Sequence, residues 1–364
     1  MKTDSLHHLM EQFWSIEEMN NKVLTTEEKA CEEHFQLHTR RLKTGQYEVR
    51  LPLSDSVNKL GESYDNAKTK FLALEQRLLK QPQLKQDYAD FLEEYLQLGH
   101  MTPLSENEDK VVPHFYLPHH EIVKETSSTT KLRVVFNGSE KSSSGVSLND
   151  ILMTGPKVQD DLYDIVQIFR LHRIVMSADI AKMYRQIWVH PDDKGLQRIL
   201  WRNTTNQPIT TYELNTVTYG TTSAPFLATQ CLQQLIEDEA DNYPEAAKLA
   251  KDGLYVDDLI TGTDEVDTAL AMQQDLMNMV RKGGFTLRKW SSNHTALLNH
   301  LAPEDVERNL LVNFGNKNVI KALGVLWNSV TDKLIFCVPV QQDMAFTKRS
   351  VLRVIASKYD PLGL

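Results

Sequence analysis

The stretch Gly253-Leu254-Tyr255-Val256-Asp257-Asp258-Leu259-Ile260-Thr261-Gly262 sets two adjacent aspartates between two apolar runs, with a glycine at each outer end. This pattern predicts a β-hairpin whose two-residue turn is Asp257-Asp258. Two neighbouring carboxylates repel each other, so such a turn either binds a cation between them or is fully solvated. The alternative is ordinary turn chemistry, because an Asp side chain accepts hydrogen bonds from the backbone of its own turn.

An earlier apolar run carries a third carboxylate. Residues 174–180 read Ile-Val-Met-Ser-Ala-Asp-Ile and predict a short strand with Asp179 near its end. An Asp on a strand together with an Asp pair on a hairpin is the donor set that a two-Mg²⁺ phosphoryl-transfer site needs. Mg²⁺ takes one or two carboxylates and completes its octahedron with waters and substrate phosphates. Two such ions, about 3.5–4 Å apart, stabilise both the attacking and the leaving oxygen.

Two motifs give the chain a family resemblance. Residues 255–258 resemble the Tyr-x-Asp-Asp signature of reverse transcriptases, and Asp179 followed five residues later by Tyr184 is similar to their first catalytic motif. The amino-acid sequence of residues 178–187 resembles the Pao/BEL class of LTR retrotransposon polyproteins in particular. The resemblance covers nearly the whole chain. It implies an α+β right-hand polymerase fold (fingers, palm and the start of a thumb) with an N-terminal helical extension, and RNA-directed DNA polymerase activity.

The resemblance also implies a metal site. Asp179, Asp257 and Asp258 match the catalytic residues, which hold two Mg²⁺ ions, with Mn²⁺ as a possible substitute. The backbone carbonyl of Ile180 matches a further metal ligand. One ion lowers the pKa of the primer 3′-OH and the other neutralises the triphosphate, so that deoxynucleotides are added to a primer on an RNA or DNA template.

Four residues match nucleotide contacts of the family. Arg133, with Lys131 beside it, matches a strand residue that contacts the incoming triphosphate, a task suited to a bidentate guanidinium; an edge strand protected by charge is the alternative. Tyr184 matches the residue that abuts the sugar 2′ position and excludes ribonucleotides, and its alternative is an ordinary core tyrosine. Lys289 matches a lysine that protonates the leaving pyrophosphate.

Residues 218–226, Thr-Tyr-Gly-Thr-Thr-Ser-Ala-Pro-Phe, open a predicted helix and resemble the family's Gly-x-x-x-Ala-Pro motif. The resemblance brings Tyr219 and Gly220 to the nucleotide. Tyr219 departs from many retroviral enzymes, which carry Gln at this position. The residues expected to contact primer or template are Tyr255, Pro225 and the turn Leu323-Gly324.

Three histidines invite a second metal interpretation. His114, His119 and His120 lie in a Pro-bounded extended stretch. Their spacing fits no zinc pattern and no cysteine is near, so we expect surface or substrate-facing side chains instead.

Composition limits the class of protein. Hydrophobic content of 41% is ordinary for a globular protein, and three scattered cysteines form no disulfide framework, which suits a reducing compartment. The sequence shows no secretory signal and no apolar run long enough to span a bilayer, so we expect a cytoplasmic protein, within virus-like particles if the element forms them. A net charge of −9 argues against a simple nucleic-acid binder, although a polymerase needs only a local basic channel.

The chain divides into four expected segments. Residues 1–45 form a linker, 46–107 a strand and a helical hairpin (65–79 and 82–99), 108–340 the fingers and palm, and 341–364 the start of a thumb or connection. Further helices are expected at 158–172, 218–240 and 264–281. The end of the sequence resembles a point where Pao/BEL chains continue, so we expect a truncated chain whose other polyprotein parts, protease, RNase H and integrase, are partners.

One alternative keeps the fold without the enzyme. A catalytically inactive or domesticated polymerase-fold fragment would act as a nucleic-acid or protein interaction module, with the acidic surface as a binding face.

Overall fold

The computed structural model describes residues 24–105, 113–123, 132–307, 319–322, 325–335 and 347–349. It is a mixed α+β structure, as the sequence predicts. Most of the N-terminal linker and of the expected segment 341–364 lies outside the described residues.

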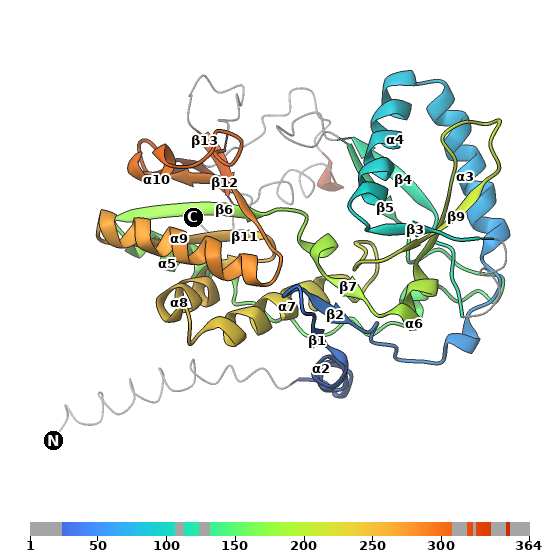
Figure 1. Cartoon of the computed structure of the whole chain (residues 1–364), viewed down its shortest axis with the longest axis horizontal. Helices are drawn as coiled ribbons and strands as arrows, with labels where there is room; N and C mark the ends of the chain where they lie inside the picture. The colour runs from blue at the N-terminus through green and yellow to red at the C-terminus, as the bar shows by residue number, and fades with distance from the viewer. Residues whose placement is uncertain are drawn as a thin grey trace.

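A four-stranded antiparallel sheet forms the centre of one half of the molecule (Figure 1). Its strand order is β10-β11-β6-β12. The strands are β6 (Ile174–Ile180), β10 (Leu254–Tyr255), β11 (Asp258–Thr263) and β12 (Leu287–Ser292). All residues of β6 except Asp179 are buried. Because both faces of this strand are covered, its sequence is a nearly continuous apolar run rather than an alternation.

Helices cover the sheet on both sides. The even-numbered residues of β6 belong to the main core, together with side chains of α7 (Ala224–Glu239), α8 (Pro244–Gly253) and α9 (Val266–Lys282). Side chains alternate along a strand, so the odd-numbered residues face the other way. There Val175 and Ile260 pack against α5 (Leu162–Leu171) and against Trp327.

Trp327 fastens a small second sheet to α5. The sheet consists of β13 (Val319–Ala322), β14 (Val325–Asn328) and β15 (Lys333–Ile335). The ring of Trp327 meets that of Phe169 edge-on at 5.1 Å, and its Nε1 donates to Asp332 at 2.9 Å. Arg170 on α5 pairs with the same carboxylate at 2.6 Å, so Asp332 links α5 and the small sheet.

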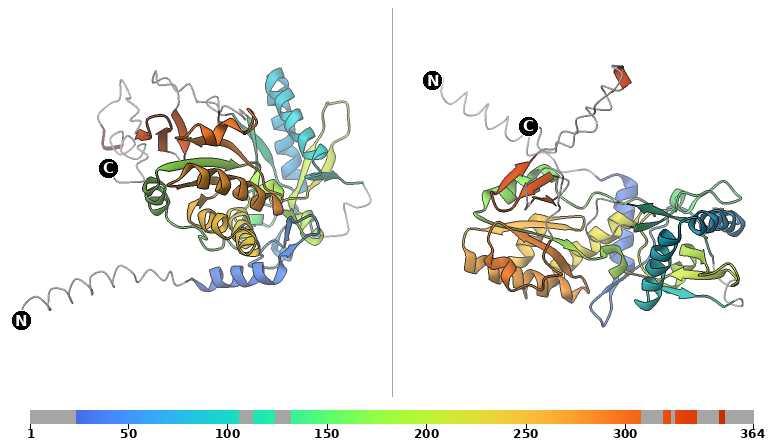
Figure 2. Two further views of the ribbon diagram at one scale, coloured as in Figure 1. Left: turned by 60° about the vertical axis from the view of Figure 1, so that its left-hand side comes forward. Right: turned by 90° about the horizontal axis from the view of Figure 1, so that it is seen from above.

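The other half of the molecule holds the helical hairpin. Helices α3 (Tyr64–Leu79) and α4 (Pro82–Gln97) lie within two residues of their predicted bounds. In Figure 1 and in the right-hand view of Figure 2 they lie on the opposite side of the molecule from α8 and α9. They pack beside a three-stranded sheet of order β3-β9-β8 and the hairpin β4-β5. These strands are β3 (Met101–Pro103), β4 (His119–Val123), β5 (Leu132–Phe136), β8 (Arg198–Trp201) and β9 (Thr210–Leu214).

His119 lies in the core of this half, which corrects the surface or substrate-facing role expected for it. Its Nε2 donates to the Leu200 carbonyl at 2.9 Å and its Nδ1 accepts from the Tyr88 hydroxyl. Burial lowers the pKa of His119 to about 4, so the ring is neutral at pH 7. His120, by contrast, is exposed, as expected.

The segment that precedes the helical hairpin α3–α4 lies between the two halves of the molecule. Strand β2 (Tyr47–Val49) pairs with β1 (Arg40–Arg41) on one side and, in parallel, with β7 (Trp188–Val189) on the other. Helix α2 (Thr26–His38) begins with a capping box between Thr25 and Glu28. The remaining short helices are η1 (Val57–Lys59), η2 (Leu148–Asp150), η3 (Met183–Gln186), α6 (Pro191–Lys194), η4 (Gly195–Gln197) and α10 (Ala296–Asn299).

Among the described residues, no helix is both long and apolar enough to cross a membrane.

Candidate active site

Asp179 and Asp258 lie directly opposite each other in the antiparallel ladder between β6 and β11. Directly opposed residues of an antiparallel pair project to the same side of the sheet, with their Cβ atoms about 4.5–5.5 Å apart. Sequence periodicity alone predicts a strand for each residue but not this register. The pairing therefore brings two carboxylates from distant parts of the chain to one face.

The hairpin tip differs from the prediction by one residue. The two turn residues are Val256 and Asp257, while Asp258 is already the first residue of β11 and pairs with Tyr255. Val256 adopts a φ of +57°, a left-handed conformation that β-branched residues rarely occupy. The Asp257 carbonyl accepts the N–H of Ile180 at 2.6 Å, so the turn is fixed to the end of β6. The predicted Asp-Asp turn is wrong because the ladder extends to Asp258.

The carboxylate of Asp257 lies in the electrostatic field of Asp179. Burial raises the pKa of Asp257, and the negative charge of Asp179 raises it further. The positive charges of Lys289 and Arg133 lower it in part. Burial, and then the charge of Asp257, also raises the pKa of Tyr184. One electrostatic environment therefore contains side chains from separate elements: Asp179, Asp257, Tyr184, Lys289 and Arg133.

Two cations contact Asp179 from β12. Lys289 Nζ donates to Asp179 Oδ2 at 3.1 Å, and Arg288 Nε lies 3.5 Å from Oδ1. Successive residues of a regular strand point to opposite faces, so two neighbours reach one carboxylate only where the strand is irregular. The register between β12 and β6 shifts between Arg288 and Ser291, and Lys289 has a φ of +54°. Sequence reasoning named Lys289 and missed this contact of Arg288, because no sequence signal marks the bulge.

The predicted nucleotide residues lie around this group. Arg133 is exposed on β5, whereas Lys131 lies outside the described residues. Tyr184 is half-buried in η3, and its ring meets that of Tyr219 edge-on at 6.2 Å. Gly220 has a φ of +107°, and a Cβ there would lie 1.9 Å from the carbonyl oxygen of Phe136. Only glycine fits so close to β5, which fixes the position of Tyr219 beside it.

The predicted primer and template residues come from three separate segments of the chain. Tyr255 is opposite Asp258 and packs partly against the cluster of Val175, Ile260 and Trp327. Pro225 is exposed in the first turn of α7. Leu323 and Gly324 fall between β13 and β14, outside the described residues.

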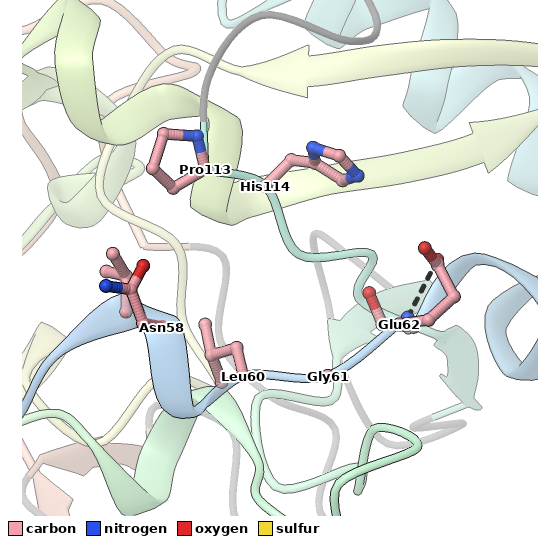
Figure 3. Close-up of a pocket in the computed structure, with 8 residues that line it drawn as sticks. Asn58, Leu60, Gly61, Glu62, Pro113 and His114 are labelled. Carbon is pink, nitrogen blue, oxygen red and sulfur yellow. Dashed lines mark hydrogen bonds between the residues drawn. The ribbon is translucent and has the colours of Figure 1, made fainter.

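A separate cavity of about 380 Å³ lies between the segment 57–63 and the pair Pro113-His114 (Figure 3). None of its lining residues is a predicted site residue, and none is Lys or Arg. The described part of this cavity therefore offers no permanently charged side chain for a phosphate group.

The donor set suits a hard divalent cation. Among the described residues, no three His, Cys, Asp or Glu side chains are grouped so that they alone could hold a metal ion. Mg²⁺, however, requires only one or two carboxylates and takes its other ligands from water and substrate. Burial is the main cause of the raised pKa of Asp257, and repulsion by Asp179 adds to it; a bound cation would relieve that repulsion. The residues present therefore fit Mg²⁺ or Mn²⁺ bound together with a phosphate-bearing substrate.

The sequence of this chain matches the family model described as Reverse transcriptase (RNA-dependent DNA polymerase) over residues 123–324. The match spans more than half of the 364 residues, and the chain belongs to this family. It is accordingly an RNA-directed DNA polymerase, a nucleotidyltransferase whose substrates are a primed nucleic-acid template and deoxynucleoside triphosphates. No curated protein matches the sequence.

Proposed function

We propose that Asp179, Asp257 and Asp258 are the catalytic carboxylates of this polymerase and that it extends a primer 3′-OH by two-metal phosphoryl transfer. The observation that carries the proposal is the direct pairing of Asp179 with Asp258, with Asp257 in the adjoining turn. The three carboxylates and the Ile180 carbonyl would hold two Mg²⁺ or Mn²⁺ ions. When bound, such ions stabilise the attacking and leaving oxygens of an in-line displacement.

The chain's own side chains then bind and orient the nucleotide. Arg133 is exposed near Asp257, which supports a contact with the triphosphate, and Lys131 is proposed to assist it. Lys289 is within hydrogen-bond distance of Asp179, which supports its role as the proton donor to pyrophosphate. Tyr184 is proposed to meet the sugar at its 2′ position. Tyr219 and Gly220 would form the neighbouring wall of the nucleotide site.

The larger architecture follows from the same proposal. The four-stranded sheet with α5 and α7–α9 would be the palm, and α3, α4 and β3–β5 would belong to the fingers. Tyr255, Pro225 and the turn Leu323-Gly324 would contact primer or template. The proposed segments are the linker 1–45, the strand and helical hairpin 46–107, the fingers and palm 108–340, and the start of the thumb or connection 341–364.

The biological context is also proposed. The amino-acid sequence of residues 178–187 supports an origin in a Pao/BEL-type LTR retrotransposon polyprotein. Protease, RNase H and integrase would be the other parts of that polyprotein. Such a polymerase would act in the cytoplasm, inside virus-like particles where the element forms them.

The test is primer extension by the purified chain on an RNA template, with Mg²⁺ or Mn²⁺, beside Asp257→Asn and the control Asp267→Asn. Asp267 is an exposed carboxylate in the first turn of α9. We expect extension by the wild type and the control and none by Asp257→Asn. In the same series, thermal stabilisation by Mg²⁺ should disappear only in Asp257→Asn. Full extension by Asp257→Asn would contradict the site, and silence from all three proteins that still bind primer-template would favour an interaction module.

A further inference from the structure

Arg185 is a buried cation next to the proposed sugar-contacting residue. It is 5% exposed and lies in η3, one position after Tyr184. Its Nη1 lies 2.7 Å from Glu94 Oε1, and its Nε donates to His100 Nδ1 at 2.9 Å. Its guanidinium carbon lies 4.0 Å from the ring centre of Tyr95. A charge this deep is costly to desolvate, so these contacts hold it in one orientation.

Glu94 also holds the other end of the same segment. Lys182 Nζ lies 2.8 Å from Glu94 Oε1, and Lys182 has a φ of +52° at the start of η3. Burial raises the pKa of Glu94, but hydrogen bonds from Lys182 and Arg185 outweigh it and leave the pKa below its ordinary value. One ionised carboxylate on α4 therefore binds both ends of the turn that carries Tyr184.

Helix α4 also contacts Tyr219, the second aromatic residue proposed to line the nucleotide site. Tyr95, the residue after Glu94, is hydrogen-bonded through its side chain to Tyr219. The rings of Tyr219 and Tyr184 meet edge-on at 6.2 Å, an arrangement that aromatic pairs favour. Both aromatic residues proposed to face the nucleotide are thus fixed, directly or through Arg185, to α4.

We propose that Arg185, anchored by Glu94, is a positioning residue that sets the discrimination between deoxyribonucleotides and ribonucleotides. The inference rests on the proposed role of Tyr184 at the sugar. Arg185 acts through the placement of the Tyr184 and Tyr219 rings and not by contact with substrate. A lysine would keep the charge but lose the planar fork that reaches His100 and Glu94 together and stacks on Tyr95.

A second ion pair on the helical hairpin provides a matched control. Arg202 binds Glu75 of α3 through two hydrogen bonds of 2.8 and 2.7 Å. This pair also ties the hairpin to the rest of the fold, but neither partner contacts Tyr184 or Tyr219 in the described contacts. Arg202→Lys therefore reports what the loss of an Arg–Glu fork does to stability alone.

The experiment measures kcat/KM for a deoxynucleotide and for the matching ribonucleotide in Arg185→Lys, Glu94→Gln, Tyr184→Val and Arg202→Lys. Primer-template affinity and thermal stability are measured beside it. We expect the discrimination ratio to fall on the order of 10-fold in Arg185→Lys and Glu94→Gln. A misplacement of about 1 Å can cost about 100-fold, and each variant removes only part of the anchoring. Arg202→Lys should keep the wild-type ratio even where it lowers thermal stability.

The outcomes separate this inference from the function on which it rests. A ratio that changes in Tyr184→Val but stays within about 2-fold of wild type in Arg185→Lys and Glu94→Gln would overturn the role of Arg185 alone. An unchanged ratio in Tyr184→Val as well would overturn the proposed role of Tyr184. If Arg185→Lys does not fold, Glu94→Gln carries the test, because the Glu94 side chain is 42% exposed.

Discussion

Lys289 and Asp179 are joined by a hydrogen bond of 3.1 Å, although 110 positions separate them in the sequence. The contact depends on the irregular stretch of β12, where Lys289 has a φ of +54°. Arg288 approaches the other oxygen of the same carboxylate at 3.5 Å. Any cation that binds Asp179 therefore competes with two positively charged side chains that already contact its carboxylate.

Replacing Lys289 should test both its proposed role as proton donor and the effect of its contact with Asp179 on metal binding. In Lys289→Met we expect the rate of nucleotide addition to fall on the order of 10²-fold, because a positioned proton donor contributes about that much. The Mg²⁺ concentration for half-maximal activity should fall, because the competing ammonium is gone. Steady-state kinetics over a Mg²⁺ titration measures both. Lys289→Arg, which keeps the charge, should retain the Mg²⁺ requirement; a Met variant with wild-type rate would refute the proton-donor role.

Removing one charge from the carboxylate group should abolish most of the activity. We expect Asp257→Asn to lose at least ~10³-fold in rate, on the order of 4 kcal/mol of barrier. The amide keeps the shape of the side chain, so circular dichroism should show an unchanged fold. Single-turnover primer extension measures the rate, with Asp267→Asn as the control. A variant within a factor of about 10 of wild type would exclude Asp257 from the site.

Acid should weaken the half of the molecule that contains His119. The pKa of this ring is lowered to about 4 by burial, against an ordinary value of 6.5. A base with a depressed pKa contributes stability that is present above pH 6.5 and is lost as the pH falls towards 4. We expect urea titrations of His119→Gln to show a smaller loss of unfolding free energy across that window, by on the order of 3 kcal/mol.

The neighbouring residue controls for this effect. His120 is exposed, so His120→Gln should follow the wild-type pH dependence. Equal slopes for the wild type and His119→Gln would mean that the buried ring does not govern the acid sensitivity.

Two glycines with left-handed backbones should respond differently to a methyl group. Gly145 has a φ of +78° and open space around its Cβ position, so Gly145→Ala should cost only the conformational penalty, about 1–2 kcal/mol. Gly220→Ala adds a clash at 1.9 Å with the Phe136 carbonyl, so its cost should exceed about 3 kcal/mol. Urea unfolding of both variants measures the difference. Equal costs would show that β5 yields to the methyl group, and Gly220 would then not be needed to fix Tyr219.

Local sequence patterns were enough to predict several helices and the protein family. Apolar spacing and flanking Pro and Gly residues predicted α3 and α4 almost to the residue, because the hydrophobic face of a helix repeats within a few positions. Periodicity was less reliable elsewhere: the helix expected at 158–172 is the shorter α5, Leu162–Leu171. The role of His119 was also missed, since a histidine has no sequence signal that separates a core position from an exposed one.

The sequence by itself determined which carboxylates gather at the candidate site, because Asp179 and the pair Asp257-Asp258 sit at the ends of apolar strands in a recognisable spacing. Only the tertiary structure decided that Asp258 belongs to the ladder and not to the turn, and that β12 turns Lys289 towards Asp179. It also decided that Glu94 anchors Arg185. These relationships depend on strand register and on packing between elements far apart in the chain, which no local pattern encodes.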